Sequence, residues 1–155
     1  MPALDPPPVV TRAAIVAEAL SWVGTPYADV QGLKGPRGGV DCGYLLLKVG
    51  QAVGIFPEAY PRPVYSPQAH LHTDREHYRE ALEAVGCQEI PWDARQPGDI
   101  VLFRFGHVAS HAAILVTATE IVHAHSRRGV LRQPVPGSWW ARLVAVYTFP
   151  RVDES

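Results

Sequence analysis

The hydropathy pattern of this chain changes near Gly98, and this change constrains the fold more than any other feature. Before it, segments 12–23, 42–53 and 77–85 carry apolar residues at helical spacing and are each followed by a glycine, which predicts three helices. After it, short runs rich in β-branched and aromatic residues predict strands at 100–105, 111–116, 121–124 and 143–149. Helices first and strands second indicate an α+β domain, so we expect N-terminal helices packed on a C-terminal antiparallel β-sheet.

Local signals support these elements. Thr11 is a suitable N-cap for the first helix, and Gly24 a suitable stop. Residues 73–76 have capping-box spacing before the third helix. The glycine-rich stretch 32–40 and the proline-rich stretch 57–67 predict loops.

The length and composition predict a single folded unit. The chain has 155 residues, 47% hydrophobic and 19% charged, and we expect a flexible segment at 1–10, one domain at 11–150 and a tail at 151–155. A formal charge of −1 provides no general attraction to nucleic acid or anionic membrane. We find neither a signal peptide nor an apolar run of the roughly 20 residues that span a bilayer, so we expect no membrane insertion.

The two cysteines differ in their surroundings. Two are too few for a disulfide framework, and we expect both Cys42 and Cys87 to be free thiols. Cys42 begins a predicted helix, where the helix dipole, together with a neighbouring histidine, lowers a thiol pKa from its ordinary value of about 8.5. Cys42 is therefore the candidate nucleophile, whereas Cys87 has no such setting.

Two histidines lie in neighbouring predicted strands. His111 begins one strand, and His123 lies in the next, after a short turn at 117–120. In a hairpin the two imidazoles come close, so that one can orient the other as in a catalytic triad. Because side chains alternate along a strand, His123 and His125 share a face, and the residues alone leave open which of them meets His111.

Other polar and aromatic residues favour structural roles. Zinc sites need three or four convergent ligands, and the seven histidines form no zinc motif, so we expect no metal and no cofactor. Asp99 is suited to accept backbone N–H groups in a turn. The remaining expectations are solvated histidines at His70, His72 and His77 and core aromatics at Trp139 and Trp140.

Taken in order, several segments resemble the NlpC/P60 family of cell-wall cysteine peptidases. They are 22–27 (Trp-Val-Gly-Thr-Pro-Tyr), Asp41-Cys42, 96–103 (Gln-Pro-Gly-Asp-Ile-Val-Leu-Phe), His111 and 121–124 (Ile-Val-His-Ala). The resemblance implies a papain-like fold with Cys42 as nucleophile at a helix N-terminus, His111 as general base and His123 as the orienting residue. It also implies that Tyr27 and Asp41 contact substrate, and we add Tyr44 and His125 as candidate substrate-binding residues.

The resemblance also implies a substrate. Family members cut the amide between D-γ-glutamate and a diamino acid in peptidoglycan stem peptides, through an acyl-enzyme and without a cofactor. The glycine-rich insertion before Asp41 resembles the phage-associated branch, which implies phage tail or secretion proteins as partners and either a virion-associated location or export by a non-Sec route.

One position departs from the family pattern. The family commonly has Asp-Cys-x-Gly, whereas this chain has Asp41-Cys42-Gly43-Tyr44. Two alternatives therefore stay open: a non-catalytic phage tail or structural module, and a cysteine acyltransferase or deamidase that acts on another substrate.

Overall fold

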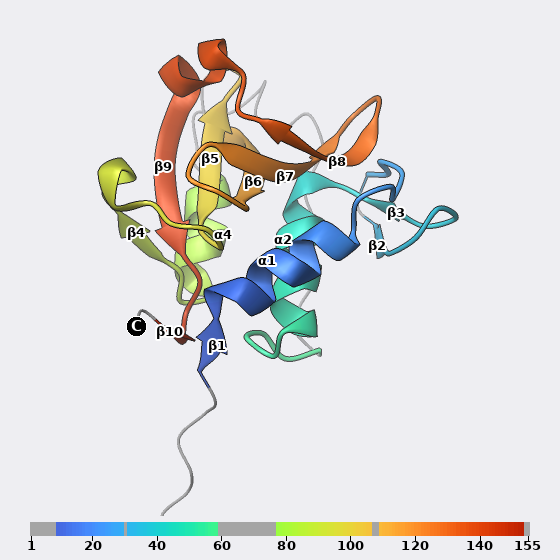
Figure 1. Cartoon of the computed structure of the whole chain (residues 1–155), viewed down its shortest axis with the longest axis horizontal. Coiled ribbons are helices and arrows are strands. Elements are labelled where there is room, and N and C mark those ends of the chain that lie inside the picture. The colour runs from blue at the N-terminus through green and yellow to red at the C-terminus, as the bar shows by residue number, and fades with distance from the viewer. Residues whose placement is uncertain (1–8, 30, 59–76, 107–108, 154–155) are drawn as a thin grey trace, which may run out of the picture.

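A computed structural model describes residues 9–29, 31–58, 77–106 and 109–153. Its α-helices are α1 (Arg12–Ser21), α2 (Cys42–Ala52) and α4 (His77–Ala84), with short 3-10 helices η1 (Trp92–Ala94) and η2 (Gly137–Arg142). Six strands form one sheet in the spatial order β4-β9-β5-β6-β7-β8, and every neighbouring pair is antiparallel (Figure 1). Their bounds are β4 Gln88–Ile90, β5 Ile100–Arg104, β6 Ala109–Leu115, β7 Glu120–His125, β8 Gly129–Pro134 and β9 Leu143–Thr148.

The three predicted helices are confirmed, with small changes at their ends. Thr11 caps α1 because its hydroxyl accepts a hydrogen bond from the Ala14 N–H at 3.1 Å. The helix ends at Ser21, two residues earlier than expected, because the chain tightens and Val23 N–H donates to the Leu20 carbonyl three residues back. Gly24 follows with a φ of 94°, a left-handed conformation that favours glycine. The expected capping box at 73–76 lies outside the described residues.

The four predicted strands are confirmed, and two edge strands were missed. β8 contains polar residues and ends in Pro134, features that lowered its strand signal. An edge strand tolerates both, because one side of it makes no ladder. β4, at the opposite edge, has only three residues, two of them exposed. The sequence pattern therefore identified the buried centre of the sheet and failed at its borders.

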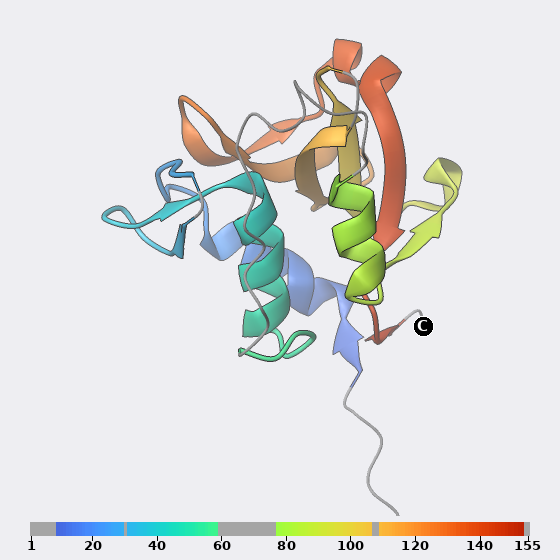
Figure 2. The ribbon, with the colours of Figure 1, turned by 180° about the vertical axis from the view of Figure 1, so that it is seen from behind.

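Each face of the sheet carries its own core. On β6, Ala112 and Ile114 belong to the core that the helices cover, whereas Ala113 and Leu115 belong to the core on the other face. Ile15 of α1, Leu45 of α2 and Leu82 of α4 all lie in the first core, so the three helices pack on one face of the sheet. Figure 2, viewed from behind, shows α4 in front of the strands and α2 in front of α1. The expected α+β arrangement is confirmed.

The two ends of the described chain meet. β1 (Val10–Thr11) pairs in parallel with β10 (Val152–Asp153), and both lie at the bottom of Figure 1. The ladder includes Val10 and Val152–Asp153, which lie outside the range 11–150 expected for the domain. A second small antiparallel pair, β2 (Gly32–Leu33) with β3 (Gly39–Val40), precedes α2. None of the helices in the described ranges combines the length and apolar character needed to cross a bilayer.

Candidate active site

Cys42 is the first residue of α2, as the sequence predicted. Its predecessor Asp41 is the N-cap: the carboxylate accepts a hydrogen bond from the Tyr44 N–H at 2.9 Å. The approach to the helix is also held, because Val40 N–H donates to the Pro26 carbonyl at 3.0 Å. The segment that contains Pro26 and Tyr27 therefore runs beside the residues that deliver Cys42.

The Cys42 thiol is enclosed and hydrogen-bonded to a residue that the sequence did not indicate. Cys42 is 8% exposed, and its Sγ lies 2.6 Å from the hydroxyl oxygen of Tyr78 on α4. The contact joins residues 36 positions apart. Because it depends on how α4 packs beside α2, no local motif could have pointed to Tyr78.

Burial raises the pKa of the Cys42 thiol, and the negative charge of Asp41 adds to that effect. The Tyr78 hydroxyl and the backbone N–H groups of Ala112 and Gly43 act in the opposite direction, because they stabilise the thiolate. We expected a lowered pKa from the helix dipole and a histidine. That expectation is wrong for this enclosed state, since desolvation outweighs the hydrogen bonds that favour the thiolate.

The two candidate histidines meet directly. His111 Nε2 lies 2.8 Å from His123 Nδ1, with the rings nearly perpendicular at 81°. The β6–β7 ladder pairs Ile114 with Val122 and Leu115 with Ile121, so its register continued would set His125 opposite His111. The contact instead runs diagonally to His123, which decides the alternative that alternation had left open.

Both histidines are neutral near pH 7. Burial, followed by the charges of His123 and His125, lowers the pKa of His111 to about 3. Burial also lowers the pKa of His123 to about 4, although the Gln133 side chain acts in the opposite direction. His123 Nε2 is buried, and within the described residues it has no partner in hydrogen-bond geometry. Gln133 lies next to it on β8, where Leu131 pairs with His123.

Trp139 covers the histidine pair. Its ring centroid lies 5.6 Å from that of His111 and 5.5 Å from that of His123, both in edge-on geometry. Trp139 and Trp140 are half-buried, so the expectation that they fill the core is only partly right. Trp140 lies near the surface, where Arg95 stacks on it at 5.1 Å.

The Cys42 thiol approaches β6 at the residue next to His111. The Ala112 N–H lies close enough to the Cys42 sulfur to stabilise a thiolate, and His111 adjoins Ala112 on the strand. No hydrogen bond joins Cys42 to His111 in the part of the chain that the structure describes. The thiol instead bonds Tyr78, and the imidazole of His111 contacts that of His123.

The four candidate substrate-binding residues differ in placement. Tyr27 donates to Asp29 Oδ1 at 2.9 Å, and its pKa is raised by burial, by this bond and by the nearby charge of Cys42. Asp41 caps α2, as described above. Tyr44 is 2% exposed and packs in the helix-side core, so its side chain does not face solvent. His125 Nδ1 accepts hydrogen bonds from the N–H groups of Arg127 and Arg128, which closes the turn before β8.

Asp99 has the structural role that the sequence predicted. Its carboxylate accepts from the Gln96 N–H at 2.8 Å and pairs with Arg12 Nη1 at 2.6 Å. The pair connects α1 to the start of β5.

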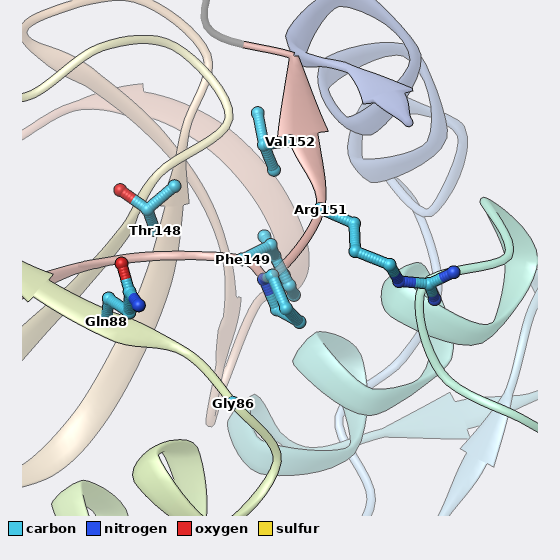
Figure 3. Close-up of a pocket in the computed structure, with 7 residues that line it drawn as sticks. Gly86, Gln88, Thr148, Phe149, Arg151 and Val152 are labelled. Carbon is cyan, nitrogen blue, oxygen red and sulfur yellow. The ribbon is translucent and has the colours of Figure 1, made fainter. Parts of the chain in front are cut away.

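A separate pocket is lined by none of the candidate catalytic residues. Figure 3 shows it beside β4 and the segment between β9 and β10, with Arg151 directed toward the loop after α2, where it donates to the Gly54 carbonyl at 3.0 Å. The described residues that line it include no histidine, cysteine or carboxylate: Gly86, Gln88, Thr148, Phe149, Pro150, Arg151 and Val152.

Histidine, cysteine and carboxylate side chains are the groups that could bind a metal ion. Among the described residues, no three His, Cys, Asp or Glu side chains lie together as metal ligands. His70, His72 and His107 lie outside those residues. Cys42 and Cys87 are both free thiols.

The NlpC/P60 family profile matches residues 24–148, which include Cys42, His111 and His123. The chain belongs to the NlpC/P60 family. The resemblance inferred from the sequence motifs is therefore confirmed.

Several relatives of this chain carry informative names. A probable endopeptidase of Mycobacterium tuberculosis is 36% identical over 125 residues, which are 81% of this chain but 26% of that protein. The probable endopeptidase NlpC of Escherichia coli is 27% identical over 137 residues, 86% of this chain and 75% of that protein. The tail tip assembly protein K of Escherichia phage lambda is 36% identical over 71 residues, 45% of this chain and 36% of that protein, which supports the expected likeness to phage-associated members. This chain thus spans only a minor part of the mycobacterial and phage relatives.

Solved NlpC/P60 structures share the fold. A Bacillus cereus family member superposes with a TM-score of 0.64 at 17% identity, over 92% of this chain and 41% of that one. RipD of Mycobacterium tuberculosis superposes with a TM-score of 0.55 at 17% identity, over 88% of this chain and 95% of that one. RipD is described as a non-catalytic NlpC/P60 domain protein adapted to peptidoglycan binding. The fold therefore occurs with and without catalysis. Whether this chain is an enzyme depends on the side chains of its site.

Proposed function

We propose that this NlpC/P60 protein is a cysteine peptidase that hydrolyses amide bonds of peptidoglycan stem peptides, with the D-γ-glutamyl–diamino acid amide as the bond cut. Cys42 is the nucleophile, His111 the general base and His123 the orienting residue. The observation that carries the proposal is the 2.8 Å contact between His111 Nε2 and His123 Nδ1, together with a cysteine at a helix N-terminus whose sulfur approaches the N–H of the residue after His111. Relatives named as endopeptidases support it.

One tautomer of the contact between the imidazoles suits these roles. When His111 donates from Nε2–H to His123 Nδ1, its other nitrogen, Nδ1, is a free base for the thiol proton. His123 then carries its own proton on Nε2, on the side of Gln133. This is the tautomer that an orienting residue must impose on a base.

The reaction follows from these roles. As the thiol proton passes to His111, the Cys42 sulfur bonds to the carbonyl carbon and the C=O electron pair moves to oxygen. The Cys42 backbone N–H, at the start of α2, stabilises this oxyanion. The tetrahedral intermediate expels the amine, which takes the proton from His111, and water deprotonated by His111 then hydrolyses the thioester.

The resting site holds neutral partners. The pKa of Cys42 is raised and that of His111 is lowered to about 3, both mainly by burial, so a stable thiolate–imidazolium pair is disfavoured. Proton transfer must then accompany the attack on substrate. Tyr27 and Asp41 lie around the start of α2 and are the proposed substrate-side residues.

Digestion of purified sacculi tests the proposal. The wild-type protein should release stem-peptide fragments whose masses identify the bond, and Cys42→Ala should release none. Equal release by both proteins, or release by neither, would reject the peptidase.

A second function has one observation in its favour. The Cys42 thiol is enclosed and bonded to Tyr78 rather than His111, as in a protein that keeps the fold without turnover. Such a module would bind sacculi in a pull-down and release no fragments. The likeness to a phage tail protein supports tail components as its partners.

A further inference from the structure

We infer that the Tyr78 hydroxyl is a catalytic hydrogen-bond donor to the Cys42 sulfur, so that the reacting group comprises Tyr78 of α4 in addition to Cys42, His111 and His123. The inference rests on the proposed function. It assigns to α4 a role that none of the family segments at 22–27, 41–42, 96–103, 111 or 121–124 contains.

The Tyr78 hydroxyl and the Cys42 thiol are direct hydrogen-bonding partners. The Tyr78 oxygen lies 2.6 Å from Cys42 Sγ, and either atom can donate while the thiol is protonated. Once the sulfur loses its proton, the hydroxyl is the partner that still has a proton to donate. Hydrogen bonds to an ionised group are stronger than neutral ones, so this bond strengthens as the nucleophile forms.

The helix that carries Tyr78 is held by other contacts. Leu82 is 6% exposed and packs in the helix-side core. Glu83 Oε1 accepts from the Tyr147 hydroxyl on β9 at 2.9 Å, and Arg79 pairs with Glu89 on β4 at 2.5 Å. These contacts place the hydroxyl independently of its bond to sulfur.

The sulfur needs such donors. The Asp41 carboxylate opposes a negative charge on Cys42, and the phenol of Tyr27 lies within electrostatic range of it. Facing the sulfur are Tyr78 from α4, the Ala112 N–H from β6 and the Gly43 N–H from α2. Of these donors Tyr78 is the only side chain, and His111 adjoins Ala112 on β6.

The same hydroxyl can follow the charge through acylation. When the sulfur bonds to the carbonyl carbon, its negative charge passes to the carbonyl oxygen, which is then one carbon away from the sulfur. A donor that already contacts the sulfur lies within reach of that oxygen. Tyr78 keeps its proton throughout, because His111 carries the proton from the thiol to the leaving amine.

If the Tyr78 hydroxyl only blocked the thiol, removing it would increase the reactivity of Cys42 instead of lowering it. Such a hydroxyl would hold the thiol away from His111, and its removal would free the nucleophile. Tyr78→Phe, which keeps the ring and removes the oxygen, separates the two roles.

The experiment is the pH dependence of iodoacetamide alkylation at Cys42, read by peptide mass mapping so that Cys87 is scored apart. Removing a hydrogen bond to the thiolate in Tyr78→Phe should raise the alkylation midpoint by about one pH unit and slow alkylation at pH 7 roughly tenfold. Tyr147→Phe is the matched control, because it removes the hydroxyl that bonds Glu83 on α4 without touching the thiol; its profile should equal that of the wild type. An unchanged or lowered midpoint in Tyr78→Phe, or an equal shift in Tyr147→Phe, overturns the inference.

A second variant covers a folding defect in Tyr78→Phe. A fluorinated tyrosine at position 78 is a stronger donor and should lower the midpoint, and a midpoint that stays in place or rises overturns the inference. Alkylation needs no peptidoglycan, so a shift without sacculus digestion rejects the proposed function and retains Tyr78 as the donor. If the wild type digests sacculi but Tyr78→Phe shows no shift of the alkylation midpoint, the proposed function is retained and the role of Tyr78 is rejected.

Discussion

His111 Nε2 and His123 Nδ1 lie 2.8 Å apart although their strands stop pairing before reaching them. The β6–β7 ladder ends at Ile114 and Val122. Beyond that point the Ala112 N–H is directed to the Cys42 sulfur, so the strands separate where the start of α2 approaches. The His111–His123 contact therefore forms beyond the end of the ladder.

Loss of the His123 ring should reduce activity far more than loss of the His125 ring. In His123→Ala the base has no partner to fix its tautomer, and kcat/KM on stem peptide should fall at least about 100-fold. His125→Ala is the control from the same strand face, because its Nδ1 bonds the turn N–H groups of Arg127 and Arg128 and not His111. Its kcat/KM should stay within about tenfold of wild type. Equal losses would remove His123 from the triad.

The buried histidines should make stability depend on pH. The pKa of His111 is about 3 and that of His123 about 4, both below the ordinary value of about 6.5. Between those values and pH 6.5 the unfolded chain binds protons that the folded chain excludes. The free energy of unfolding is therefore fully retained above about pH 6.5 and should fall by about 1.4 kcal/mol per pH unit and histidine as the pH drops toward 4.

Urea unfolding at pH 7 and pH 5 measures this dependence. The double variant His111→Gln, His123→Gln should lose less stability between the two pH values than the wild type. If both proteins lose the same amount, the rings are not held neutral in the fold.

Asp41 should contribute to stability and to thiol chemistry in separable ways. Asp41→Ala removes the cap on the Tyr44 N–H and should cost about 1 kcal/mol of unfolding free energy. Asp41→Asn keeps an oxygen that can accept this bond but removes the charge that raises the pKa of Cys42. We expect near-wild-type stability and a lower alkylation midpoint for Asp41→Asn. A higher midpoint would contradict this assignment.

Replacing Gly50 with alanine, a change that normally stabilises a helix, should destabilise this protein. A methyl group at this position of α2 would overlap the ring of Phe56, which is 7% exposed and packs against Phe149. Gly50→Ala should therefore lower the free energy of unfolding by about 1–3 kcal/mol instead of raising it. Adding Phe56→Leu should make the two effects non-additive in a double-mutant cycle, and strict additivity would show that the ring is not the obstacle.

Much of the fold follows from local pattern, and the misses share a cause. Ile100–Arg104 and Glu120–His125 were predicted because central strands are buried and apolar. β4 and β8 were missed because edge strands pair on one side only and therefore carry more polar residues. The buried position of Tyr44 was equally hidden, since helical spacing does not say which neighbours cover a side chain.

The sequence by itself determined the helix that begins at Cys42, the strands that hold His111 and His123, and the family to which their order points. Those features depend on residue type and short-range periodicity. Only the tertiary structure decided that His123 rather than His125 bonds His111, that burial raises the pKa of Cys42, and that Tyr78 bonds its sulfur. These depend on strand register, desolvation and the packing of α4, which arise from residues far apart in the chain.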